Sequence, residues 1–170
     1  MIELTHTAID TTRVLAAVSD ANCGAEVLFV GTTRRWTQAQ AAGSDQPATI
    51  ETSHLIYEAY QEMAVAQLER LEAEARNRWP IRQVAIVHRL GRVEPLEASV
   101  AIAVSCPHRS EAFEAAKWLI DEIKHHVPIW KQEHYVQSGP QWIHPTSGSC
   151  SCDSKSGSAH AKTVQQAQQQ

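Results

Sequence analysis

Residues 105–133, SCPHRSEAFEAAKWLIDEIKHHVPIWKQE, predict a helix with titratable side chains before it, near its end and beyond it. Ser110 is a good N-cap, and the acidic residues Glu111 and Glu114 in the first turn complement the positive end of the helix dipole. Pro128 lacks an amide donor and pushes the residue before it out of helical geometry. The stretch therefore predicts a helix that ends near Val127, followed by an extended segment.

The apolar side chains of this helix repeat at helical spacing. At about 100° per residue, one stripe faces a core; its members are Phe113, Ala116, Ile120, Ile123 and Val127. Lys124 falls at the edge of the stripe, about 20° from Phe113 on the helical wheel. A lysine there either extends its ammonium into water or is held in a cleft where it can exchange a proton. Both interpretations stay open from the wheel alone.

Basic side chains around the helix suggest a site for a small anion. His108 and Arg109 precede the helix, Lys124 lies near its end, and Lys131 follows the proline. With a rise of about 1.5 Å per residue, His108 and Lys124 are more than about 20 Å apart along the axis. One small substrate cannot contact both within one chain. A bent loop, a long substrate or a second copy of the chain would be needed.

The rest of the chain alternates between strand and helix patterns and predicts an α+β sandwich with a mainly antiparallel sheet and helices packed on it. Strands are expected at 1–7, 24–31, 49–57, 83–90 and 98–105, and helices at 10–18 and 58–78. Asp10 is the expected cap of the first helix. The apolar face of the second carries Met63, Leu68, Leu71 and Ala75.

Two segments lack apolar periodicity. Residues 37–48 are small and polar and predict a mobile loop, which follows Gly31 and the pair Arg34 and Arg35. Gly31 at a strand end would let the backbone approach a ligand. Residues 146–170 are rich in Ser, Gly, Lys and Gln and predict a disordered tail. The expected organisation is a single catalytic domain over residues 1–145.

Composition narrows the class of protein. The chain has 170 residues and a formal net charge of -4, which argues against general nucleic-acid binding. No apolar run resembles a secretion signal or a membrane span, so a cytoplasmic protein is expected. The four cysteines show no disulfide spacing and predict free thiols. Cys150 and Cys152 with two histidines of the tail are only a weak metal motif, and no metal site is expected.

Several separated motifs, taken together, resemble one family. They are Gly31-x-x-Arg34, Ser105-x-x-His108-Arg109-Ser110, Lys124-x-x-x-Pro128-x-Trp130-Lys131-x-Glu133, the Glu74 to Pro80 helix end and the Val87 to Gly91 strand end. In this order they resemble the large, catalytic subunits of molybdopterin synthase, the MoaE family, over roughly residues 24–142. One departure is Thr32, where the family often has a lysine.

The resemblance implies an α/β hammerhead-type fold and a homodimer within a heterotetramer, with no metal or organic cofactor. The expected partner is a small ubiquitin-like subunit whose C-terminal Gly-Gly carries a thiocarboxylate. The expected reaction is a sulfurtransferase step of molybdenum cofactor biosynthesis, in which sulfur passes to cyclic pyranopterin monophosphate and generates the molybdopterin dithiolene. The implied substrate-binding residues are Thr32, Thr33, Arg34, His108, Arg109, Lys124, Lys131, Gln132 and Glu133. In this family such sites are completed across the subunit interface.

Side-chain chemistry suggests a division of roles. Arginine binds phosphate in a bidentate manner, so Arg34, His108 and Arg109 are expected to bind anions. Lys124 is the first candidate for proton transfer and Lys131 the second. Two alternatives remain: a thiol-dependent enzyme that uses Cys106 beside His108, and a protein that binds a partner without catalysis.

Overall fold

The computed structural model describes residues 1–40, 47–137 and 140–143. Three helices and nine strands make up this part of the chain. In chain order they are β1 (Ile2–Thr5), α1 (Thr11–Ala16), β2 (Ala25–Thr32), β3 (Trp36–Gln40), β4 (Pro47–Ala59), α2 (Gln61–Arg78), β5 (Gln83–Arg89), β6 (Gly91–Val93), β7 (Ala98–Cys106), α3 (Arg109–His126), β8 (Ile129–Tyr135) and β9 (Gln141–Ile143). The α+β class and the mainly antiparallel pairing are confirmed.

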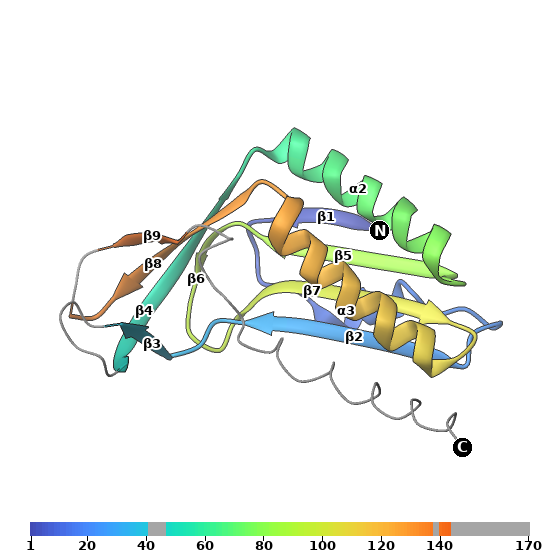
Figure 1. Cartoon of the computed structure of the whole chain (residues 1–170), viewed down its shortest axis with the longest axis horizontal. Helices are drawn as coiled ribbons and strands as arrows, with labels where there is room; N and C mark the ends of the chain where they lie inside the picture. The colour runs from blue at the N-terminus through green and yellow to red at the C-terminus, as the bar shows by residue number, and fades with distance from the viewer. Residues whose placement is uncertain (41–46, 138–139, 144–170) are drawn as a thin grey trace, which may run out of the picture.

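The first sheet has the strand order β1-β5-β7-β2, in which only β1 and β5 run parallel. Because side chains alternate along a strand, β5 and β7 contribute to both faces. Val84, Ile86 and Ile102 face α2 and α3, whereas Ala85 and Ala103 face α1. The short alanines let a helix of one and a half turns approach the sheet closely. Figure 1 shows α2 and α3 lying side by side over this sheet.

Helix α3 packs its small and branched residues against the sheet. Its buried residues are Ala112, Ala115, Ala116, Leu119, Ile120 and Ile123. The expected stripe was wrong at one position: Phe113 is 63% exposed, because the buried face is centred one position away, on Ala112 and Leu119. The expected N-cap was also wrong. His108 is the N-cap, and Ser110 lies within the helix, where its hydroxyl donates to Glu114.

Helix α2 confirms the predicted end before Trp79 and Pro80, but it begins at Gln61. Residues 58–60 do not belong to it, because strand β4 continues through Ala59 in register with β8. Leu68, Leu71 and Ala75 are buried as expected, together with Ala64. Met63 was placed wrongly on the buried face and is 48% exposed.

The second sheet contains β3, β4, β8 and β9, with β6 also paired to β4. It extends from one end of the first sheet (Figure 1). The predicted loop at 37–48 was wrong at both ends: residues 37–40 of β3 pair with residues 47–50 of β4 as an antiparallel ladder. Backbone pairing produces strands here without apolar alternation. Residues 41–46, the remainder of that prediction, and the predicted tail at 146–170 lie outside the described residues.

Gly31 is required by packing. A Cβ atom at this position would lie 2.7 Å from Cγ1 of Val100 on the neighbouring strand. Close packing against the side chain of Val100 therefore explains the glycine without a ligand. The register between β2 and β7 shifts just after it, between Gly31 and Thr32. This irregularity directs the chain away from the first sheet and into the loop that carries Arg34.

Candidate active site

Strand β8 presents three polar side chains on one face. Lys131, Glu133 and Tyr135 alternate along the strand and therefore point the same way. The Lys131 ammonium lies 2.6 Å from Oε1 of Glu133. The Tyr135 hydroxyl donates to Oε2 of the same carboxylate, also at 2.6 Å. Both oxygens of Glu133 are thus engaged, one by a cation and one by a neutral donor.

The carboxylate of Glu133 is buried but strongly stabilised. Its residue is only 7% exposed, and burial by itself raises the pKa of a carboxyl group. The hydrogen bonds from Lys131 and Tyr135, with the charges of Lys131 and Arg34, outweigh burial and lower the pKa of Glu133. Burial and the bond to Glu133 raise the pKa of Tyr135 to about 12. At neutral pH, Glu133 is an anion and Tyr135 is a donor.

Arg34 reaches this cluster from the loop between β2 and β3. Thr33, which is 2% exposed, fixes the loop, because its amide donates to the carbonyl of Glu97 and its carbonyl accepts from Leu96. The neighbouring Arg35 is paired with Glu51 at 3.3 Å. Among the described residues Arg34 has no such ion pair, and its side chain is exposed. It is therefore available to an anion.

One predicted site residue lies apart from this cluster. Gln132 points to the opposite face of β8, where its side-chain carbonyl accepts a hydrogen bond from His134 at 2.7 Å. Thr32 is the exposed last residue of β2. The structure therefore brings together Arg34, Lys131 and Glu133, with Thr33 holding the loop, and does not bring Gln132 to them.

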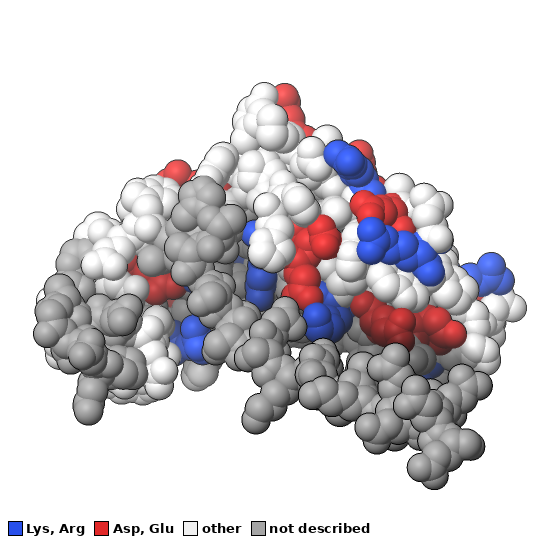
Figure 2. Space-filling view, in the orientation of Figure 1, with Lys and Arg blue, Asp and Glu red and all other residues white. Residues whose placement is uncertain are grey.

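The remaining predicted residues occupy the two ends of α3. His108 and Arg109 are exposed at its N-terminal end, and Lys124 is exposed in its last turn. A helix rises about 1.5 Å per residue, so His108 and Lys124 are about 24 Å apart along the axis. Figure 2 shows basic and acidic side chains interspersed on the face of the molecule that carries α2 and α3. One copy of the chain does not assemble all of the predicted cations around one small molecule.

Cys106, the nucleophile of the alternative thiol mechanism, is poorly suited to that role. Its side chain lies in the core at 0% exposure, beneath α3. Burial, with smaller contributions from Cys23 and Glu111, raises the pKa of the thiol to about 11. Because the thiolate is the reactive form, a buried and protonated thiol cannot attack a substrate at neutral pH.

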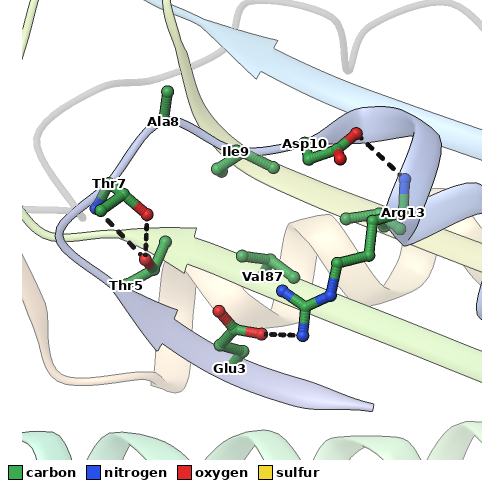
Figure 3. Close-up of a pocket in the computed structure, with 9 residues that line it drawn as sticks. Glu3, Thr5, Thr7, Ala8, Ile9, Asp10, Arg13 and Val87 are labelled. Atoms are coloured by element: carbon green, nitrogen blue, oxygen red, sulfur yellow. Dashed lines mark hydrogen bonds and ion pairs between the residues drawn. The ribbon is translucent and has the colours of Figure 1, made fainter.

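A cavity of about 180 Å³ lies elsewhere, between β1 and α1. Figure 3 shows Glu3 and Arg13 at one side of it, joined by an ion pair of 2.8 Å. None of the predicted site residues lines it. Within the described ranges, no group of three or more His, Cys, Asp or Glu side chains is placed to hold a metal ion. Nor does any helix described here have the length and apolarity to cross a membrane.

Sequence reasoning missed two residues of the site. Tyr135 could have been found, because the alternation of Lys131, Glu133 and Tyr135 is visible once a strand is assumed after Pro128. Glu97 could not, since it meets Thr33 only through the folded turn between β6 and β7. Its carboxylate also accepts from Arg89 at 3.0 Å and from the amide of Glu94 at 2.9 Å. These bonds hold the turn against which the Arg34 loop rests.

Comparison with known proteins agrees with this architecture. The family model described as MoaE protein matches residues 4–126. The molybdopterin synthase catalytic subunit of Bacillus subtilis is 41% identical over 141 residues, which are 83% of this chain and 83% of that protein. Some other curated relatives are longer, and this chain spans about a third of their length.

Solved structures give the same result. Molybdopterin synthase from Staphylococcus aureus superposes with a TM-score of 0.74 and 35% identity, over 83% of this chain and 95% of that one. A Helicobacter pylori structure, described as a complex of subunits 1 and 2 of molybdopterin-converting factor, has a TM-score of 0.62 at 22% identity. It covers 84% of this chain and 88% of that one, and at this identity it supports the fold alone. The chain belongs to the MoaE protein family, the family of molybdopterin synthase catalytic subunits.

Proposed function

We propose that this chain is the catalytic subunit of a cytoplasmic molybdopterin synthase and acts as a sulfurtransferase. Its sulfur donor would be the thiocarboxylated C-terminus of a small ubiquitin-like partner, and its acceptor cyclic pyranopterin monophosphate. Each transfer forms a carbon–sulfur bond to a side-chain carbon of the pterin and breaks a carbon–oxygen bond of that carbon, whose oxygen leaves as water or as an oxygen of the opened cyclic phosphate. Water then cleaves the acyl carbon–sulfur bond, so the partner leaves with a carboxylate and the sulfur stays on the product.

One observation carries this proposal beyond family membership: Lys131 is paired with the buried carboxylate of Glu133, whose pKa the charge of Arg34 also lowers. The family model matches residues 4–126, and Lys131 and Glu133 follow that region on strand β8. A phosphate and a thiocarboxylate are both anions and need fixed cations nearby. Arg34 is suited to the phosphate through its planar fork, and Lys131 supplies a compact charge.

Lys124 is the proposed proton-transfer residue. It is exposed in the last turn of α3 and, among the described residues, makes no ion pair. The attack on the pterin and the hydrolysis that follows both need proton transfer, which a lysine amine can supply and an arginine cannot. Lys131, held by Glu133, is the second candidate for this role.

The proposed site is completed by a second copy of the chain. His108 and Arg109 lie about 24 Å along α3 from Lys124, so they would serve the site of the neighbouring subunit. An exposed arginine and histidine at the positive end of a helix suit an anionic group there.

The test is direct formation of product. Purified chain is mixed with the thiocarboxylated partner and cyclic pyranopterin monophosphate, and molybdopterin is measured after oxidation to a fluorescent pterin. The proposal expects product only when all three components are present. Partner binding without product would favour the non-catalytic alternative, and product with a partner that ends in an ordinary carboxylate would exclude this sulfur source.

A further inference from the structure

We infer that Tyr135 is a positioning residue that acts through Glu133 to hold Lys131 as a fixed cation for the anionic substrate. This inference rests on the proposed function for the identity of the substrate. It rests on the geometry of β8 for the chain of contacts, in which the Tyr135 hydroxyl, the Glu133 carboxylate and the Lys131 ammonium follow one another at 2.6 Å each.

Burial changes along this chain of contacts. Tyr135 is 8% exposed and Glu133 is 7% exposed, whereas the side chain of Lys131 is 32% exposed. The two buried members therefore face the protein, and the ammonium lies where the cluster opens to solvent. An ammonium has three donors. Glu133 takes one of them, which leaves two that can bind an anion from outside.

The ion pair with Glu133 restricts the Lys131 side chain, which is otherwise very mobile. Lysine has a flexible stem of four carbons. A lysine side chain that is not held in place therefore loses much conformational entropy when its ammonium binds an anion. Glu133 is itself oriented by the Tyr135 hydroxyl, because a carboxylate with both oxygens bonded has no freedom to rotate. In this proposal Glu133 acts through Lys131 and does not touch the substrate, since a carboxylate repels a phosphate.

Few other groups face Glu133. The charged or titratable ones are Lys131 and Tyr135 of the same strand and Arg34 from the loop after β2. Its cross-strand neighbours, Leu55 on β4 and Gln141 on β9, carry no charge. Loss of the Tyr135 hydroxyl therefore removes one of the three groups that stabilise the anion within the described part of the chain.

The first measurement does not depend on activity. In Tyr135→Phe, the carboxyl pKa of Glu133, followed by NMR titration of the full chain, is expected to rise, because a hydrogen bond to the charged form is lost. Tyr60→Phe is the matched control, since Tyr60 is 53% exposed and distant in sequence from β8. An unchanged Glu133 titration in Tyr135→Phe would overturn the inference.

The second measurement separates positioning from structural support. Tyr135→Phe should raise KM for the pterin substrate about tenfold, near the lower end for a bond to a charged group, with kcat within about twofold. In the pH profile of kcat/KM, the decrease on the acid side, which the protonation of Glu133 causes in this proposal, should move to higher pH. In a Lys131→Met background the same substitution should have no further effect on KM. Equal effects in both backgrounds would refute the inference.

Glu133→Gln covers the case in which Tyr135→Phe fails to fold, because it keeps the shape and removes the charge. It should raise KM at least as much and abolish the decrease on the acid side. A variant with wild-type KM would contradict the positioning role. A further outcome is that the wild-type chain forms no molybdopterin while the NMR titration gives the expected result. In that case the proposed function is wrong, and the positioning of Lys131 by Glu133 and Tyr135 is retained.

Discussion

Two inactive variants should restore each other's activity if each site uses residues of both subunits. His108→Ala removes a group at the N-terminal end of α3, and Lys124→Met removes one about 24 Å away at the other end. Loss of a bond to a charged group costs about 1.5 to 3 kcal/mol, so His108→Ala alone should be about ten to more than a hundredfold slower. Lys124→Met alone should be at least about a hundredfold slower, because it removes the proposed proton-transfer group. Neither substitution affects the core, because both side chains are exposed.

The expected recovery follows from dimer statistics. After equal mixing by co-expression, half of the dimers contain one chain of each kind, and each of these has one intact site and one doubly altered site. The mixture should therefore recover about one quarter of wild-type turnover per site. His108→Ala mixed with Arg109→Ala is the control, since both changes affect the same end of the helix and no intact site can form. No recovery in the first mixture would show that the site lies within one chain, or that His108 is not part of it.

Three further predictions concern single positions. Cys106→Ser should keep most activity in the product assay, because its thiol is buried and protonated; a loss of more than about tenfold, or about 1.4 kcal/mol in barrier, would support the thiol mechanism. His88 is buried with its pKa lowered to about 4 from 6.5, so the unfolded state binds the extra proton between these values and stability falls as pH drops through them. Chemical denaturation should show a loss of about 3 kcal/mol between pH 7 and pH 4 that His88→Gln largely removes, and an equal loss in both proteins would contradict this. Leu96 has a φ of 74° and is 83% exposed, so Leu96→Gly should raise the free energy of unfolding by about 0.5 kcal/mol while Leu96→Ala should not.

Local patterns in the sequence predicted most of the first sheet and its helices. Asp10 caps α1 as expected, with its carboxylate accepting from the amides of Thr12 and Arg13. Pro80 and Pro128 follow the ends of α2 and α3, because a proline constrains the residue before it wherever the chain folds. These signals are local, so they can be recognised without knowledge of the tertiary structure.

The second sheet was harder to predict, because its strands depend on partners far away in the sequence. Residues 37–40 have no alternating apolar pattern and form a strand only by pairing with residues 47–50. The predicted burial of Phe113 was wrong for a similar reason. A helical wheel groups apolar residues by angle alone. In the structure, the side of α3 that packs on the sheet carries alanines, which let the helix approach closely.

The residues of the candidate site could be named from the sequence, but their geometry could not. Arg34, Lys131 and Glu133 were named from the motifs; the structure pairs Lys131 with Glu133, and the charge of Arg34 lowers the pKa of that carboxyl group. Gln132 was included because it is adjacent in sequence, whereas alternation along β8 places it on the opposite face. The long separation of His108 and Lys124 could be expected from helix geometry alone, and the structure places them at opposite ends of α3.

Single-turnover molybdopterin formation with preloaded thiocarboxylated partner measures whether Lys124 transfers a proton during sulfur transfer. Lys124→Met should lower this rate by at least about a hundredfold, while partner binding and the unfolding midpoint remain unchanged. Lys124→Arg should not restore the rate, because an arginine keeps its proton near neutral pH. Rates close to wild type in both variants would contradict proton transfer by Lys124 and leave Lys131 as the remaining lysine candidate.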